Sequence, residues 1–173
     1  HVIIETNYCD IVEIDIHKTK DNILVINHDD CMDRMCLTED KVETEITKDV
    51  VIKDSTYEEL LQYNMGRNFV DLNGNKPYEN LTIEEADAQN LTIMTLEEFL
   101  TKYENYNFKL YLEIKESGEE ANKTADMVQE LFDQNKYSTW RNRTMIISFT
   151  NSVVDYIATN YPNQAVGALG YKI

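Results

Sequence analysis

The chain has few of the residues that interrupt or crosslink a fold: two prolines, five glycines and three cysteines in 173 residues. Without Pro/Gly-rich or low-complexity linkers it has no obvious division, and its length suits one domain with a substantial core. Cys9, Cys31 and Cys36 are odd in number and lack a zinc spacing, so we expect reduced thiols and a cytoplasmic protein. No stretch is long and apolar enough to predict a membrane span, and these residues contain no signal peptide.

Positive charge is also scarce. Sixteen Lys and Arg stand against 32 Asp and Glu, for a net charge of -16. Nucleic-acid binding depends on neutralising phosphates, so this balance excludes DNA or RNA as an expected partner. It also disfavours docking on an anionic membrane. An anionic substrate therefore requires a local positive centre, either a metal ion or a particular Lys or Arg.

The apolar pattern predicts an α/β fold. We expect short helices after capping boxes at 55–58 and 95–98, and longer ones at 119–135 and 152–161. Strands are expected at residues 11–17, 23–27, 109–115, 145–149 and 165–169. From residue 109 onward strands and helices alternate, which indicates parallel strands joined by crossover helices. Residues 37–93 fit this alternation poorly, and we expect an insertion subdomain there.

The first two predicted strands are separated by a turn too short for a parallel crossover, so they predict an antiparallel hairpin. With Asp21 and Asn22 as the two-residue loop, Asp15 faces His28 and Glu13 faces Asp30. Strand alternation places Glu13 and Asp15 on one face, roughly 7 Å apart along the strand.

Two interpretations of this polar face are open. It can be the solvated side of an ordinary amphipathic strand. Alternatively it faces inward, where carboxylates need a cation to offset repulsion and desolvation. The later segment "KLYLEIK" favours the second interpretation, because Glu113 and Lys115 repeat the arrangement. Three carboxylates, Glu13, Asp15 and Glu113, suit Mg²⁺ or Ca²⁺ better than zinc. His17 lies one step beyond Asp15, and we expect it to be a partly exposed strand histidine.

Taken together, "VEIDIHKTKDNILVINHDDCMDR", "MTLEEFL", "LYLEIKE" and "MIISF" resemble the glycerophosphodiester phosphodiesterase family. That pattern is Glu-x-Asp, a Thr-Lys-Asp turn, a strand ending His-Asp, an Asp-Arg pair, a Thr-Leu-Glu-Glu helix start and a Glu-x-Lys strand. The resemblance implies a (β/α)8 TIM barrel of the phospholipase C-like type, with residues 1–173 forming a partial barrel and 37–93 its insertion. It implies hydrolysis of small glycerophosphodiesters to glycerol 3-phosphate and an alcohol.

The resemblance also implies roles for particular residues. Glu13, Asp15 and Glu113 would hold one divalent cation, Ca²⁺ or Mg²⁺. His28 would be one of two catalytic histidines, and Lys115 would contact the substrate phosphate. Asp29 and Arg34 also match motif positions, and we expect them to serve structure or orientation.

The ends depart from the family pattern. The His-Arg-Gly strand, which supplies the other catalytic histidine, has no match here. Residues 1–10 resemble the end of the helix that follows it, and "AVGALGYKI" resembles the fifth barrel strand. We therefore expect a fragment of a longer product. Two other functions stay open: a phospholipase C-like or D-like enzyme acting on intact lipids, and an inactive barrel that binds a metal or a protein partner.

Overall fold

A computed structural model describes residues 9–36 and 49–170. The chain divides into two compact units, one of His1–His17 with Leu96–Ile173 and the other of Lys18–Thr95. We describe each unit by itself. Among the described residues, no helix is long and apolar enough to cross a membrane.

The first unit is built on parallel strands in the order β1-β4-β5-β6. The β1–β4, β4–β5 and β5–β6 pairs are all parallel, as the alternation of strands and helices predicted. The strands are β1 (Ile11–Lys18), β4 (Lys109–Ile114), β5 (Thr144–Ser148) and β6 (Ala165–Ala168). All four were expected within one residue at either end.

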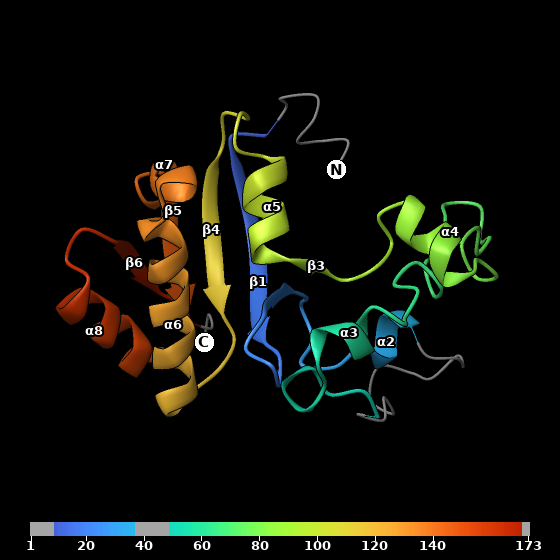
Figure 1. Cartoon of the computed structure of the whole chain (residues 1–173), viewed down its shortest axis with the longest axis horizontal. Coiled ribbons are helices and arrows are strands. Elements are labelled where there is room, and N and C mark those ends of the chain that lie inside the picture. Colours follow the sequence, from blue (N-terminus) through green and yellow to red (C-terminus); the bar gives the residue numbers. More distant parts are fainter. Residues whose placement is uncertain (1–8, 37–48, 171–173) are drawn as a thin grey trace. The chain divides into compact units, whose positions relative to one another are not determined.

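Helices α5 (Leu96–Lys102), α6 (Gly118–Asp133), α7 (Ser138–Arg141) and α8 (Asn151–Asn160) complete the first unit, with a short 3-10 turn at Asn135–Tyr137. Helices α6 and α8 pack against the strands and against each other (Figure 1). The predicted apolar stripe of α6 is buried at Ala121, Ala125, Val128 and Phe132. This helix covers the sheet because its apolar side chains recur at helical spacing.

An aromatic cluster packs where strands β4 and β5 of the first unit begin. Trp140 is fully buried, and its ring lies 6.2 Å from Phe99 and 5.7 Å from Phe108. Its indole N–H donates to the carbonyl oxygen of Leu100 at 3.2 Å, so burial leaves this polar group satisfied. The guanidinium of Arg143 lies 3.5 Å from the indole centroid. Burial lowers the pKa of Arg143.

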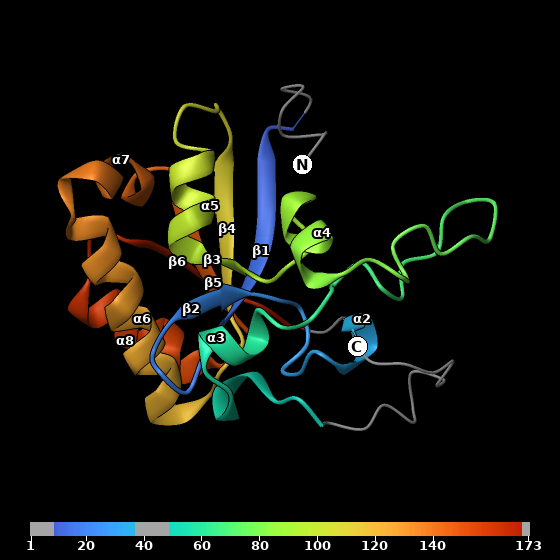
Figure 2. The same ribbon diagram turned by 45° about the vertical axis from the view of Figure 1, so that its right-hand side comes forward.

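The second unit has a small core of its own. Strands β2 (Leu24–Ile26) and β3 (Met94–Thr95) pair antiparallel, and β3 was not predicted. The short helices are α2 (Asp33–Cys36), α3 (Tyr57–Leu60) and α4 (Ile83–Ala88), with a 3-10 turn at Ile52–Asp54. The core consists of Val25, Met32, Cys36, Ile52, Leu60 and Ile93. Figure 2 shows these elements from a second direction.

The predicted capping box at 55–58 is wrong by one residue. The Thr56 hydroxyl accepts from the backbone N–H of Glu59, and the Glu59 carboxylate accepts from the N–H of Thr56. The Ser55 hydroxyl instead donates to the carbonyl oxygen of Val51 at 2.8 Å. Both registers satisfy the same pattern, and the backbone hydrogen bonds of the preceding 3-10 turn decide between them.

The Thr-Lys-Asp turn has a structural role. The Thr19 hydroxyl donates to Asp21 at 2.6 Å and accepts from the N–H of Ile23 at 2.9 Å. Asp21 also accepts from the N–H of Tyr57, at the start of α3. Asn22 adopts a positive φ of 60°, which Asn tolerates better than most residues. The motif therefore joins the turn to the first turn of α3.

The expected insertion at 37–93 falls inside Lys18–Thr95, a larger range, and it stays a prediction. Residues 37–48 lie outside the described residues, as do 1–8, for which the sequence predicted the end of a helix.

Candidate metal centre and active site

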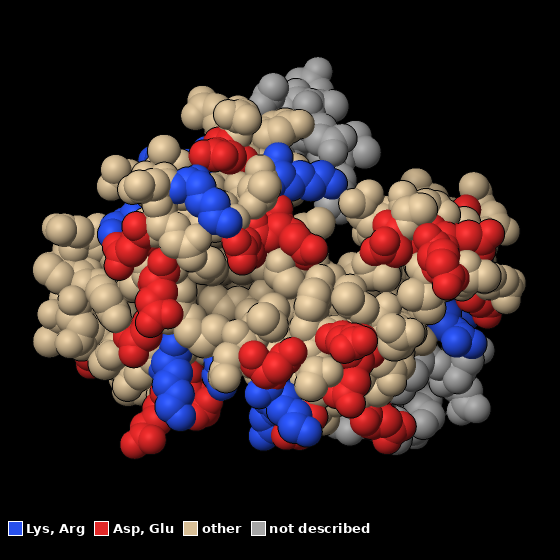
Figure 3. All heavy atoms as spheres, viewed as in Figure 1, with Lys and Arg blue, Asp and Glu red and all other residues tan. Residues whose placement is uncertain are grey.

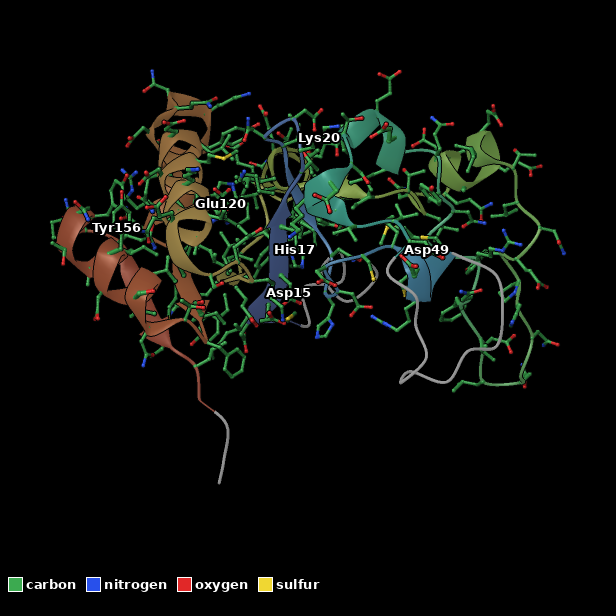
Figure 4. The ribbon with its side chains drawn as sticks, turned by 90° about the horizontal axis from the view of Figure 1, so that it is seen from below. Asp15, His17, Lys20, Asp49, Glu120 and Tyr156 are labelled. Carbon is green, nitrogen blue, oxygen red and sulfur yellow. The ribbon has the colours of Figure 1, made fainter. Side chains whose placement is uncertain are left out.

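The first carboxylates of the site come from β1. Alternation along this strand buries Ile14 and Ile16 and turns Glu13 and Asp15 to the opposite face. Asp15 is half-buried, whereas Glu13 is exposed. Figure 4 shows Asp15 and His17 following one another along β1.

The third carboxylate comes from β4. The parallel register places Glu113 directly beside Asp15, and paired residues on neighbouring strands share a face. Glu113 is buried, with 8 % of its surface exposed. Ligand oxygens of Glu13, Asp15 and Glu113 all lie within 4.8 Å of one another. The structure thus brings together the three residues predicted as metal ligands.

Lys115 lies at the same cluster. Its ammonium nitrogen is 3.1 Å from Glu113 Oε1 and 3.3 Å from Asp15 Oδ1. Burial by itself would lower the pKa of Lys115, but the hydrogen bond to Glu113 and the charges of Asp15 and Glu113 outweigh burial and raise it. Lys115 therefore stays protonated at neutral pH and offsets part of the negative charge.

These side chains fit a hard divalent cation. Three carboxylates and one ammonium give the group a net charge of -2, which equals the charge that a divalent ion offsets. The donors are all oxygen atoms, which Mg²⁺ and Ca²⁺ prefer, and no histidine or thiol belongs to the set. Glu13, Asp15 and Glu113 would hold the ion.

Hydrogen bonds from the β5–α8 turn support the end of β4. The Ser148 hydroxyl donates to the carbonyl oxygen of Ile114 at 2.9 Å, and it accepts from the N–H of Thr150 at 3.1 Å. The Thr150 hydroxyl in turn reaches the carbonyl oxygen of Glu116 at 3.4 Å. These bonds fix the backbone on both sides of Lys115. Ser148 falls in the quoted "MIISF", but nothing in the sequence revealed this contact.

The expectation for His17 is wrong. The residue is buried, with 7 % of its surface exposed, rather than partly exposed. Its Nδ1 lies 3.9 Å from Glu116 Oε1. Glu116, which directly follows the Glu-x-Lys motif, is therefore within reach of this ring. β4 ends beside Ile16, and the chain that follows it brings Glu116 next to the His17 ring, a contact that the position of His17 near the turn does not reveal.

His28 belongs to the second unit, where a chain of polar contacts holds it. Its Nδ1 lies 2.7 Å from Asp29 Oδ1. Arg34 Nε donates to the other oxygen of Asp29 at 2.6 Å. Since an ionised carboxylate only accepts hydrogen bonds, Nδ1 carries the proton in the neutral ring, and Nε2 is the nitrogen without one. The His28 side chain is largely exposed.

These contacts are compatible with the orienting role expected for Asp29 and Arg34, which stays a prediction. Burial alone would raise the pKa of Asp29, but hydrogen bonds and charges from Arg34 and His28 outweigh it and lower the pKa. The carboxylate stays ionised and keeps the His28 ring in one tautomer. The pairing of His28 with Asp15, which joins one unit to the other, stays a prediction.

Comparisons with known proteins give a consistent result. Residues 7–171 match the model of the glycerophosphoryl diester phosphodiesterase family. A comparison with curated proteins returned no match.

Three solved structures share the fold. A glycerophosphodiester phosphodiesterase from Parabacteroides distasonis has a TM-score of 0.62 at 22% identity, over 98% of this chain and 55% of its own. One from Agrobacterium tumefaciens has a TM-score of 0.61 at 16% identity, over 95% and 56%. A phosphodiesterase from Oleispira antarctica, in complex with the product sn-glycerol-3-phosphate, has a TM-score of 0.60 at 20% identity, over 94% and 55%. The chain thus spans about half the length of these structural relatives.

Proposed function

Because this chain belongs to the glycerophosphoryl diester phosphodiesterase family and has its TIM-barrel fold, incomplete in this chain, we propose that its parent protein hydrolyses glycerophosphodiesters. The products are glycerol 3-phosphate and an alcohol. The observation that carries the proposal is the convergence of Glu13, Asp15 and Glu113 with Lys115, an arrangement suited to an anionic phosphodiester.

The carboxylates hold one divalent cation, Ca²⁺ or Mg²⁺. When bound, this ion supplies positive charge that polarises a phosphoryl oxygen. Lys115 adds a second positive charge where negative charge develops at phosphorus. Its contacts with Glu113 and Asp15 keep the ammonium protonated and aimed at the same small volume.

His28 transfers a proton at Nε2. Hydrolysis forms a bond from the nucleophilic oxygen to phosphorus and breaks the bond to the alcohol, so one proton leaves the nucleophile and one reaches the leaving oxygen. His28 serves one of these transfers. The other is served by the second catalytic histidine of the family pattern, which belongs to the His-Arg-Gly strand that has no match in this chain. Asp29 stabilises the ring when it is doubly protonated, and Arg34 fixes Asp29.

The cellular location is also part of the proposal. Cys9, Cys31 and Cys36 are all free thiols in the structure. Cys31 and Cys36 are buried, and burial raises the pKa of both. Unpaired thiols are typical of reducing compartments, which supports a cytoplasmic enzyme.

The test measures hydrolysis of glycerophosphocholine through the release of glycerol 3-phosphate. It is carried out with this chain and with the longest gene product that contains it. Glu113→Gln should lower turnover at least about a hundredfold, the scale of losing one electrostatic group at the reacting centre. Glu119→Gln is the matched control, because Glu119 is exposed on the first turn of α6 and makes the same chemical change. Chelation of divalent ions should abolish activity in wild type. Equal turnover in both variants, or full activity after chelation, contradicts the proposal.

A further inference from the structure

The turn that carries His28 is closed from inside by one buried side chain. Asn27 directly follows β2, and only 7 % of its surface is exposed. Its side-chain nitrogen donates to the carbonyl oxygen of Asp29 at 2.8 Å and to that of Cys31 at 3.1 Å. His28 lies within the stretch of chain that these two hydrogen bonds enclose. We call residues 27–31 the histidine turn.

The two acceptors determine which way the Asn27 amide points. Backbone carbonyl oxygens only accept hydrogen bonds, so only the NH₂ group of the side chain can face them. This group has two protons, one for each carbonyl oxygen. An aspartate at this position would have nearly the same shape but would place an oxygen against both carbonyls. The contact therefore requires an amide rather than a carboxylate.

A second segment of the same unit holds the end of the histidine turn. Cys31 pairs with Val51 in an isolated antiparallel bridge. The buried carboxylate of Asp33 accepts from the backbone N–H groups of Asp49 and Val50, at 2.7 and 3.1 Å. Figure 4 shows Asp49 beside α2. Since β2 holds one end of the turn and this segment holds the other, the hydrogen bonds of Asn27 set the path of the residues between them.

The histidine turn carries the polar contacts of the proposed active site. The Nδ1 of His28 lies 2.7 Å from Asp29 Oδ1, and Arg34 binds the other oxygen of Asp29. One of the two carbonyl oxygens that Asn27 binds belongs to Asp29 itself. A shift of the backbone at Asp29 would therefore move its carboxylate relative to the His28 ring. Because the His28 side chain is largely exposed, packing does little to hold it in place.

We propose that Asn27 is a positioning residue for His28. Its two hydrogen bonds hold the histidine turn so that Asp29 keeps the ring in the tautomer with the proton on Nδ1. The consequence for catalysis rests on the proposed function: Nε2 is then the nitrogen that accepts a proton from the nucleophile or, once protonated, gives it to the leaving oxygen.

The first test is the tautomer of His28 in this chain, measured by nitrogen NMR of the imidazole side chains at about pH 9, above the ordinary titration range of histidine. Wild type should show a protonated Nδ1 and an unprotonated Nε2. Asn27→Asp should lose this preference and shift the signals toward a mixture of both tautomers, because an acceptor replaces the donor. His28→Gln identifies the His28 signals among those of the three histidines in the chain.

Asn64→Asp is the matched control. Asn64 is equally buried in the same unit, and its side chain donates to the carbonyl oxygen of Tyr78 at 2.7 Å. Both variants add one negative charge to a chain of -16, in which acidic side chains already predominate over α4 (Figure 3). A difference between them therefore reports the histidine turn rather than net charge or the loss of a buried amide. If either variant fails to fold, Asn27→Ala and Asn64→Ala make the same comparison without added charge.

The second test is hydrolysis of glycerophosphocholine by the longest gene product that contains this chain. Asn27→Asp should lower kcat about tenfold and leave KM nearly unchanged, because a misplaced proton-transfer group slows the chemical step without weakening substrate binding. Asn64→Asp should keep the wild-type kcat.

Three results overturn the proposal: a wild-type His28 protonated at Nε2, unchanged His28 signals in the Asn27 variants, or an equal change in the Asn64 variants. Equal kcat values for Asn27→Asp and Asn64→Asp in an active enzyme also overturn it. If wild type hydrolyses nothing but the tautomer changes only in the Asn27 variants, the proposed function fails and the positioning of His28 by Asn27 stands.

Discussion

Asp15 and Glu113 lie directly side by side on neighbouring parallel strands, and the ammonium of Lys115 contacts both carboxylates. Their separation along the chain is nearly a hundred residues, yet the β1–β4 register places them on one face. This relationship makes the acidic group a site, because the carboxylates converge on a common volume and share one counter-charge.

The first prediction concerns cation binding. Millimolar Ca²⁺ or Mg²⁺ should raise the melting temperature of wild type by several degrees, since a hundredfold excess over Kd adds about 2.7 kcal/mol to the free energy of unfolding. Glu113→Gln should lose this increase, whereas Glu119→Gln should keep it. Thermal melting with and without each ion measures both. The same increase in all three proteins would place the ion elsewhere.

The second prediction concerns Lys115. Without divalent ions, Lys115→Gln should lower the free energy of unfolding by about 1–2 kcal/mol, because three carboxylates then repel one another in a partly buried position. Added cation should restore more stability to this variant than to wild type, since the competing ammonium is gone. Chemical denaturation with and without the ion measures the two effects.

Lys123→Gln is the control for that experiment. Lys123 pairs with Glu120 on the exposed surface of α6, so its loss should change the free energy of unfolding little in either condition. If both lysine variants behave alike, Lys115 does not neutralise the acidic group.

The third prediction uses the lowered pKa of Asp29. A carboxylate whose pKa is lowered in the folded state stabilises the protein at pH values above its unfolded-state pKa, near 3.8. This stabilisation is lost as the pH falls through the folded-state pKa. Asp29→Asn should therefore be less stable than wild type by roughly 1 kcal/mol at pH 6. The difference should shrink below about pH 4. Urea denaturation across this range measures it, and a difference that grows with acid would contradict the assignment.

The fourth prediction concerns the thiols. Burial raises the pKa of Cys36 to about 12, so at pH 8 this thiol is almost entirely protonated and shielded. Cys9 is only half-buried. Iodoacetamide should therefore label Cys9 well before Cys36 in the folded protein, and urea should remove the difference. Peptide mapping by mass spectrometry gives both rates. Equal rates without urea would show that Cys36 is not buried.

Periodicity was sufficient for most of the first unit. Its strands and the long helix α6 could be predicted because the apolar residues recur at the periods of two and 3.6 that burial on one face requires. The second unit was harder. Strand β3 has only two residues, and the capping box had two possible registers, at Ser55 and at Thr56. Local pattern cannot settle these points, because β3 depends on pairing with the distant strand β2 and the register of the capping box depends on the preceding 3-10 turn.

The sequence by itself determined which chemistry the chain carries: an excess of acid, two strands with carboxylates on one face, and the motif that identified the family. Only the tertiary structure decided that Lys115 lies between Asp15 and Glu113, that His17 is buried beside Glu116, and that Ser148 supports the end of β4. It also showed that the buried Asp33 carboxylate holds the backbone at Asp49 and Val50. The reason is physical: periodicity reports which face a residue occupies within its own strand or helix, whereas contacts and exposure depend on the register between elements that the chain brings together from far apart.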